Sequence, residues 1–304
     1  MSFWDDVKAS FQRGDLLTRL IYVNVAVFLL VKVVGVVGFL FQARWDVAQP
    51  FTLPAELSIF IRRPWSIISY MFLHMNFMHL FFNLLWLYFG GQIFVNFLSQ
   101  RKLLSTYLLG GIFGGVLYML AYNVFPVFAS YLSVSVALGA SAGVLAVLVA
   151  IATFVPNYTV RLFLLGNVQL KYIAIISVVL DVLSIPNGNA GGHIAHLGGA
   201  AYGFLYASGL KKGQNSSAWF ERVLDEVFGF FTRLFSGAAI KRSPLRPVFN
   251  ARKEGTRSAH RSSSSNSTPD PQKRVDEILD KIKVSGYASL TAEEKRFLFD
   301  FSKR

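Results

Sequence analysis

Residues 134–155 read VSVALGASAGVLAVLVAIATFV, an apolar run that contains Gly139-Ala140-Ser141-Ala142-Gly143 and is closed by Pro156. A hydroxyl placed in hydrocarbon must find a partner, so the serine needs an explanation. A helix from Ser141 to Pro156 would be about 22 Å long, against a hydrocarbon core of about 30 Å. The stretch therefore predicts a short membrane helix whose serine lies roughly 8 Å below one surface.

A helix that begins at Ser141 has a second consequence. Its first backbone N–H groups have no partner within the helix, and its positive dipole end faces the serine. Such donors can hold an oxyanion in a dry site. We therefore interpret Ser141 as a nucleophile. The alternative is that Gly139, Ser141 and Gly143 serve only close helix packing.

The composition separates the chain into two parts. It has 304 residues, 53% hydrophobic and 15% charged, with a net charge of +13. Residues 1–210 carry 11 Lys and Arg and six Asp and Glu, whereas residues 211–304 carry 19 and 11. This pattern predicts a membrane domain followed by a polar tail. No cysteine is present, which excludes disulfides, thiolate metal sites and a catalytic thiol.

Hydropathy predicts an all-α membrane protein, a bundle of six spans with both termini cytoplasmic. The predicted spans are 20–41, 74–98, 103–122, 141–154, 173–185 and 193–210. Basic residues lie mainly on one side of the membrane under this arrangement, which sets the orientation. Residues 44–73 are rich in aromatic residues and proline and predict a membrane-embedded first loop with short helices. Lys32, inside the first span, either extends to the interface or faces the bundle.

The boundaries divide the chain into five predicted segments. They are a cytosolic N-terminus (1–16), the six-span domain (17–212), an amphipathic segment on the inner surface (213–240), a disordered linker (241–274) and a small helical module (275–304). In the last segment Thr291-Ala-Glu-Glu294 predicts a capping box. Residues 161–171, with Gly166-Asn167 at their centre, predict a cytosolic hairpin.

Polar residues gather at one depth. The second, fourth and sixth spans all run from outside to inside, and each begins with polar side chains: His74, His79 and Asn83, then Ser141, then His193 and His196. Intramembrane groups of this kind usually serve function. His79 and Asn83 are four residues apart, so they share a helix face and can donate to one oxyanion.

Glycines distinguish the two histidines of the sixth span. At 100° per residue, the centre of Gly199 and Gly203 lies about 40° from His196 and about 100° from His193. Glycine ridges let helices approach closely. His196 is therefore the better general base, which would deprotonate Ser141 and later protonate the leaving amine. A metal site at His193 and His196, completed by His74 and His79, is the alternative. The sequence argues against it because we find no nearby carboxylate and no His-Glu-x-x-His motif.

The three motifs together resemble the rhomboid family of intramembrane serine proteases. They are His79-x-x-x-Asn83, Gly139-x-Ser141 and Ala195-His196-x-x-Gly199-x-x-x-Gly203. The resemblance covers residues 15–212. One departure is Trp65-Ser66, where the family's first loop has Trp-Arg. Residues 275–302 also resemble, more weakly, a helical module appended to some bacterial rhomboids.

The resemblance implies an endopeptidase of the plasma (inner) membrane that cleaves single-span substrates near their outer ends. It implies Ser141 as nucleophile, His196 as base and acid, and an oxyanion hole from His79, Asn83 and the Ser141 amide. It also implies that the fifth span moves aside for substrate. Expected partners are transmembrane substrates and lipid, not nucleic acid, and no cofactor or metal is expected. The sequence makes no prediction of oligomeric state. The alternatives are a proteolytically inactive rhomboid-like protein that binds transmembrane segments, and a histidine-ligated metal or transport protein.

Overall fold

The structure is a computed structural model that describes residues 5, 10–11, 14–42, 46–162, 166–236, 275–278, 280–282 and 289–301. The chain forms two compact units, Met1–Ile240 and Lys241–Arg304. The predicted linker, residues 241–274, lies outside the described residues.

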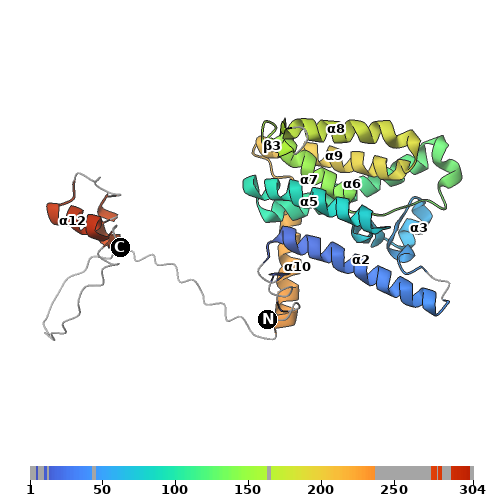
Figure 1. Cartoon of the computed structure of the whole chain (residues 1–304), viewed down its shortest axis with the longest axis horizontal. Helices are drawn as coiled ribbons and strands as arrows, with labels where there is room; N and C mark the ends of the chain where they lie inside the picture. Colours follow the sequence, from blue (N-terminus) through green and yellow to red (C-terminus); the bar gives the residue numbers. More distant parts are fainter. Residues whose placement is uncertain are drawn as a thin grey trace, which may run out of the picture. The chain divides into compact units, whose positions relative to one another are not determined.

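The first unit is mostly helical, and Figure 1 shows α5 to α9 lying side by side. The long helices are α2 (Leu16–Leu40), α5 (Phe77–Phe97), α6 (Gln100–Val124), α7 (Ser141–Phe154), α8 (Leu170–Ser184), α9 (Ala190–Lys211) and α10 (Ala218–Ser236). Among the described residues, four helical segments are long and apolar enough to cross a membrane: Leu16–Leu40, Phe77–Phe97, Gln100–Val124 and Leu170–Asn187. The shorter apolar helix is Ser141–Phe154. The count of six spans stays a prediction.

Helix α7 is the centre of this unit. It contacts α5, α6, α8 and α9, and its residues from Ala142 to Ala152 are all buried. These residues are small or β-branched apart from two leucines, so neighbouring helices can approach on every side. An apolar helix without a polar face belongs in the interior of a bundle. The predicted nucleophile therefore stands at the end of the most enclosed helix.

The region before α5 forms the predicted first loop and is tied to the start of α7. It contains η1 (Gln49–Phe51), β1 (Leu53–Pro54), α3 (Leu57–Arg62), α4 (Ser66–Ser69) and η2 (Tyr70–Phe72). Strand β1 pairs antiparallel with β2 (Val136–Ala137), with Leu53 opposite Ala137. Trp65 donates its Nε1–H to the carbonyl of Pro50, 3.0 Å away. The neighbouring Ser66 is fully buried. Within the described residues the Ser66 hydroxyl has no hydrogen-bond partner, so the polar side-chain contact of this pair comes from Trp65.

Most of the long helices begin a few residues from the predicted starts of the spans, and two of these differences concern the candidate site. Helix α5 begins at Phe77 rather than at 74, because the side chain of Asn76 accepts a hydrogen bond from the His79 N–H and caps the helix. His74 therefore precedes the helix. Helix α9 begins at Ala190 rather than at 193, after Asn189 in a left-handed conformation. Both histidines of α9 consequently lie within its first two turns.

The predicted hairpin is confirmed. Strand β3 (Thr159–Leu162) pairs antiparallel with β4 (Gly166–Gln169). After α9 the chain turns at Gly213, which has φ +76°, and continues into α10. Within the predicted amphipathic segment, residues 218–236 are helical, and their place on the inner membrane surface stays a prediction.

The second unit is small. It contains α12 (Ala292–Phe301) and the helical residues 275–278 and 280–282. The predicted capping box is confirmed: the Thr291 N–H donates to Glu294 Oε2 at 2.7 Å, and the Glu294 N–H donates to Thr291 Oγ1 at 3.3 Å. Lys281 Nζ also lies 2.8 Å from Glu294 Oε1.

Candidate active site

Helix α7 begins at Ser141, as the sequence predicted. Gly139 has φ +129°, a backbone conformation that side-chain-bearing residues rarely adopt. Its N–H donates to the carbonyl of Tyr70 at 2.9 Å. Ala140 is the N-cap and offers no side-chain hydrogen bond. The sharp turn at Gly139 therefore places Ser141 at an end of α7 whose backbone N–H groups face outward without a side-chain cap.

A cavity of about 740 Å³ opens at this helix end. Its polar lining side chains include Ser141, His196, His79, Asn83 and Asn189. They come from α5, α7, α9 and the residue before α9. All four residues that the sequence nominated for chemistry thus line one cavity.

His79 lies beside Ser141. A Cβ built on Gly139 would lie 2.9 Å from the His79 ring at Nε2 and 3.6 Å from Ser141 Oγ. The absence of a side chain at Gly139 therefore keeps the space between the ring and the hydroxyl open. Asn83 is buried and donates from Nδ2 to the carbonyl of His79 at 2.8 Å. Its amide has a second N–H, which remains for another acceptor.

The glycines of α9 face α7, as the helical-wheel argument predicted. A Cβ on Gly199 would lie 2.1 Å from the carbonyl oxygen of Ala142, and one on Gly203 would lie 2.3 Å from that of Ala146. Both contacts are with backbone, which cannot yield as a side chain can. Gly143 packs in the same way against Tyr107 of α6. Backbone contact with α7 thus fixes the position of α9 against α7, and with it the position of His196.

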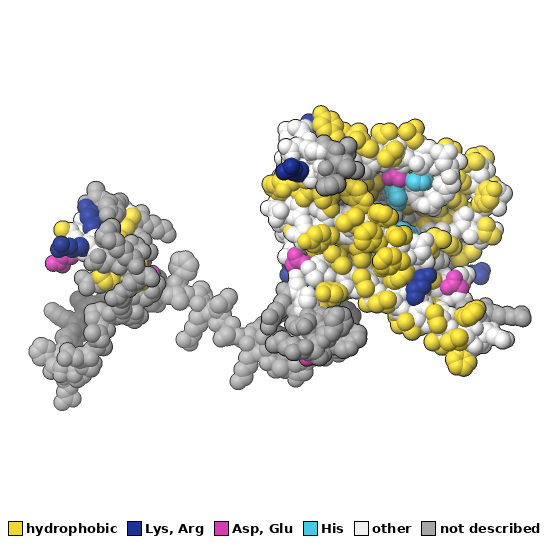
Figure 2. Space-filling view, in the orientation of Figure 1, with side chains coloured by type: hydrophobic (Ala, Val, Ile, Leu, Met, Phe, Trp, Pro, Cys, Tyr) yellow, Lys and Arg dark blue, Asp and Glu magenta, His cyan; other side chains and the backbone are white. Residues whose placement is uncertain are grey.

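The sequence argument missed Asp181. This residue of α8 places Oδ1 2.8 Å from His196 Nδ1 and 2.8 Å from His193 Nδ1. The statement that no carboxylate lies near the histidines was wrong, because the acid comes from the neighbouring helix. Figure 2 shows histidine and acidic side chains together on a face that is otherwise largely hydrophobic. A lone acid within an apolar helix was the signal that could have found it.

The same three residues have the spacing of a possible metal site. Ligand atoms of Asp181, His193 and His196 all lie within 4.8 Å of one another. His74 and His79, which the sequence suggested as further ligands, do not belong to this group within the described part of the chain. His74 is 5% exposed and instead packs edge-to-face against the His79 ring, with centroids 5.1 Å apart.

Lys32 has a specific partner. Its Nζ donates to the carbonyl of Met75 at 2.7 Å, and it lies over the Phe28 ring at 5.6 Å. The side chain is exposed. Lys32 therefore joins α2 to the turn that precedes α5, and is not among the residues that line the candidate site.

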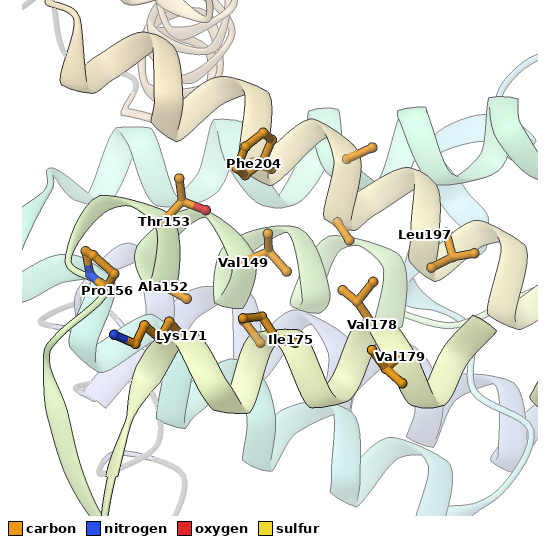
Figure 3. Close-up of a pocket in the computed structure, with 13 residues that line it drawn as sticks. Val149, Ala152, Thr153, Pro156, Lys171, Ile175, Val178, Val179, Leu197 and Phe204 are labelled. Carbon is orange, nitrogen blue, oxygen red and sulfur yellow. The ribbon is translucent and has the colours of Figure 1, made fainter. Parts of the chain in front are cut away.

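A second cavity, of about 620 Å³, separates α8 from α7 and α9. Figure 3 shows Val178 and Val179 of α8 on one side and Val149 of α7 with Leu197 of α9 on the other. Its lining is apolar apart from Thr153 and Lys171. Helix α8 is thus separated from its neighbours by a groove along part of its length.

Two parts of the chain match known protein families. A model of the rhomboid domain matches residues 62–212, which include all of the candidate site residues and Asp181. Residues 269–304 match a family of unknown function, DUF6576. A search of curated proteins found no match. The rhomboid match spans α5 to α9 and the cavity at Ser141, and the apolar helices agree with a multi-pass membrane protein. The chain belongs to the rhomboid family.

Proposed function

We propose that this protein is an intramembrane serine endopeptidase that cleaves single-span transmembrane substrates near the outer membrane face. One observation carries the proposal. Ser141, His196, His79 and Asn83 come from three helices and line one cavity, and Ser141 stands at the start of α7. A nucleophile, a base and oxyanion donors in one cavity are the set that acyl transfer requires.

In this mechanism Ser141 Oγ attacks the scissile carbonyl while His196 Nε2 takes its proton. The carbonyl oxygen becomes an oxyanion, which the Ser141 N–H and the side chains of His79 and Asn83 stabilise. His196 then returns the proton to the leaving amine, and the C–N bond breaks. Water attacks the acyl-enzyme by the same route in reverse and frees Ser141.

The position of Asn83 and His79 supports the oxyanion role. His79 lies near Ser141 across Gly139, and Asn83 is one turn further along the same helix, with an amide that carries a second N–H. The end of α7 adds its dipole and its backbone donors. These are donors fixed by helices, which need no reorganisation as charge develops.

The proposed setting is the plasma (inner) membrane, with six spans and both termini cytoplasmic. The distribution of basic residues supports this orientation. It places the start of α7 in the outer half of the membrane. Substrates would present an unwound segment there, since a peptide bond within a helix does not expose its carbonyl to attack.

The test uses purified full-length protein in liposomes with a panel of single-span substrates. We expect wild type to cleave at least one substrate, and Ser141→Ala and His196→Ala to abolish cleavage. Ser135→Ala, a serine before β2 and outside the cavity lining, is the matched control and should cleave as wild type does. Cleavage that persists in Ser141→Ala would contradict the proposal. Wild type that binds the substrates without cutting any would favour the inactive rhomboid-like protein.

A metal-dependent function is a second candidate because of Asp181. Two histidines and one carboxylate are a ligand set that catalytic zinc uses. Dialysis against a chelator separates the candidates. Under the serine mechanism, chelation leaves cleavage unchanged. Under the metal mechanism, chelation abolishes activity, zinc restores it, and Ser141→Ala remains active.

A further inference from the structure

The carboxylate of Asp181 contacts the histidine that we propose as the base. Its Oδ1 lies 2.8 Å from Nδ1 of His196, and the Asp181 side chain is 12% exposed. An ionised carboxylate can only accept hydrogen bonds, and each oxygen has two lone pairs. One oxygen can therefore accept from both His193 and His196. The contact requires that each ring carry a proton on Nδ1.

This requirement fixes the tautomer of His196. A neutral imidazole carries one proton, so a proton held on Nδ1 leaves Nε2 with its lone pair. Nε2 is then the atom able to accept the proton of Ser141. The opposite tautomer would present an N–H to the serine and could not act as a base.

The location of Asp181 strengthens the argument. It is the acidic residue within the apolar helix α8, where a charge is costly unless paired. Its partners are the two histidines of α9. A helix that needed only packing would be more stable with an apolar residue at this position.

We infer that Asp181 is a positioning residue that holds His196 in the tautomer with its proton on Nδ1 and stabilises the imidazolium that forms when Nε2 accepts the Ser141 proton. Asp181 remains ionised throughout, and the proton moves only between Ser141 Oγ, His196 Nε2 and the leaving amine. The inference rests on the proposed function, and it adds a third member to the pair of Ser141 and His196.

The tautomer can be measured without catalysis. The chain has five histidines, so selective ¹⁵N labelling of imidazoles gives a small set of NMR signals. The two ring-nitrogen signals that are missing from His196→Ala belong to His196. We expect the His196 signals of wild type to report a proton on Nδ1, and those of Asp181→Asn to move towards the other tautomer or a mixture. A proton on Nε2 in wild type, or an unchanged tautomer in Asp181→Asn, overturns the inference.

Kinetics give a second readout. Loss of a group that orients a functional histidine costs roughly 10- to 10⁴-fold in known cases. We expect Asp181→Asn to lower kcat at least tenfold with KM nearly unchanged, and Asp181→Glu to recover part of the loss. Ser177→Ala is the matched control. Ser177 lies one turn earlier on α8, donates to the carbonyl of Ile173 within its own helix, and should not alter kcat.

The two experiments distinguish the two proposals. Full kcat in Asp181→Asn, in protein whose cleavage depends on Ser141, overturns the role of Asp181 and leaves the protease proposal standing. Wild type that shows the expected tautomer but no Ser141-dependent cleavage overturns the protease and, with it, the catalytic role of Asp181.

Discussion

Two of the neighbours of helix α9, α7 and α8, hold it in different ways. Towards α7, Gly199 and Gly203 bring the two backbones into direct contact. Towards α8, Asp181 bonds to His193 and His196, and an apolar groove of about 620 Å³ lies along the boundary. One boundary leaves no space for a methyl group, whereas the other contains space for several side chains.

This difference matches the roles that we propose. A nucleophile and its base need fixed geometry, because a displacement of 1 Å can cost about 100-fold in rate. Backbone contact supplies that fixity between α7 and α9. We propose that α8 gives way to a substrate along the apolar groove, whose lining does not include Asp181, while the contact between Asp181 and His196 is kept. The predictions below test this contrast, from the largest expected effect to the smallest.

The largest effect should follow Gly199→Ala. The new Cβ would lie 2.1 Å from the Ala142 carbonyl oxygen, so α9 must move away from α7 and carry His196 with it. We expect a loss of activity on the order of 100-fold and a lower Tm. Gly35→Ala is the control, since nothing lies within 4 Å of a Cβ there. Wild-type turnover in Gly199→Ala would show that the contact is not rigid.

A smaller effect should follow Gly139→Ala, because the atoms nearest to the new Cβ belong to the side chains of His79 and Ser141. The φ of +129° costs roughly 1–3 kcal/mol for alanine, and the Cβ would also push the His79 ring, 2.9 Å away. Gly188→Ala has a comparable strain, φ +103°, with nothing within 4 Å. Activity in Gly139→Ala should fall below that of Gly188→Ala. Equal activities would mean that His79 has no part in the reaction.

A cross-link between α8 and α9 tests whether these two helices must separate for cleavage. Val178 and Leu197 line the groove from opposite sides (Figure 3), and the chain has no cysteine of its own. In Val178→Cys/Leu197→Cys, a short bifunctional thiol reagent should slow cleavage of a single-span substrate several-fold. The cross-link should not affect labelling of Ser141 by a small fluorophosphonate, because a molecule of that size reaches the serine without movement of α8. An unchanged cleavage rate would place substrate entry elsewhere.

The smallest effect concerns the second unit, where Glu294 accepts hydrogen bonds from Lys281 and Thr291. The hydrogen bond from Lys281, followed by that from the Thr291 N–H, lowers the pKa of Glu294 below its ordinary value of 4.5. Its stabilising contribution is therefore present above that value and lost as the pH falls through the lowered pKa. The protection factors of the α12 amides against hydrogen exchange should fall over this acidic range. Glu294→Gln should remove much of that pH dependence, and an unchanged profile would exclude Glu294 as its source.

The sequence predicted the start of α7 and the face of α9 because both follow from local rules. Small residues before Ser141 indicate a turn, and the 100° step of a helix places Gly199 beside His196. The start of α5 was misplaced because Asn76 caps it, although an asparagine at that position is itself a helix-start signal. Asp181 could not be paired with His196 from spacing, because two separate helices bring them together. Only the energetic cost of a charged side chain in an apolar helix indicated that Asp181 has a function.

The short ladder between β1 and β2 has a consequence for exchanging parts between relatives. Leu53 and Pro54 of the first loop share backbone pairing with Val136 and Ala137, and Gly139 bonds to Tyr70 at the end of that loop. The first loop and the turn before Ser141 therefore form one structural unit that must be exchanged as a whole. A chimaera that takes its loop from another rhomboid should keep activity only when it takes the segment before Ser141 from the same parent.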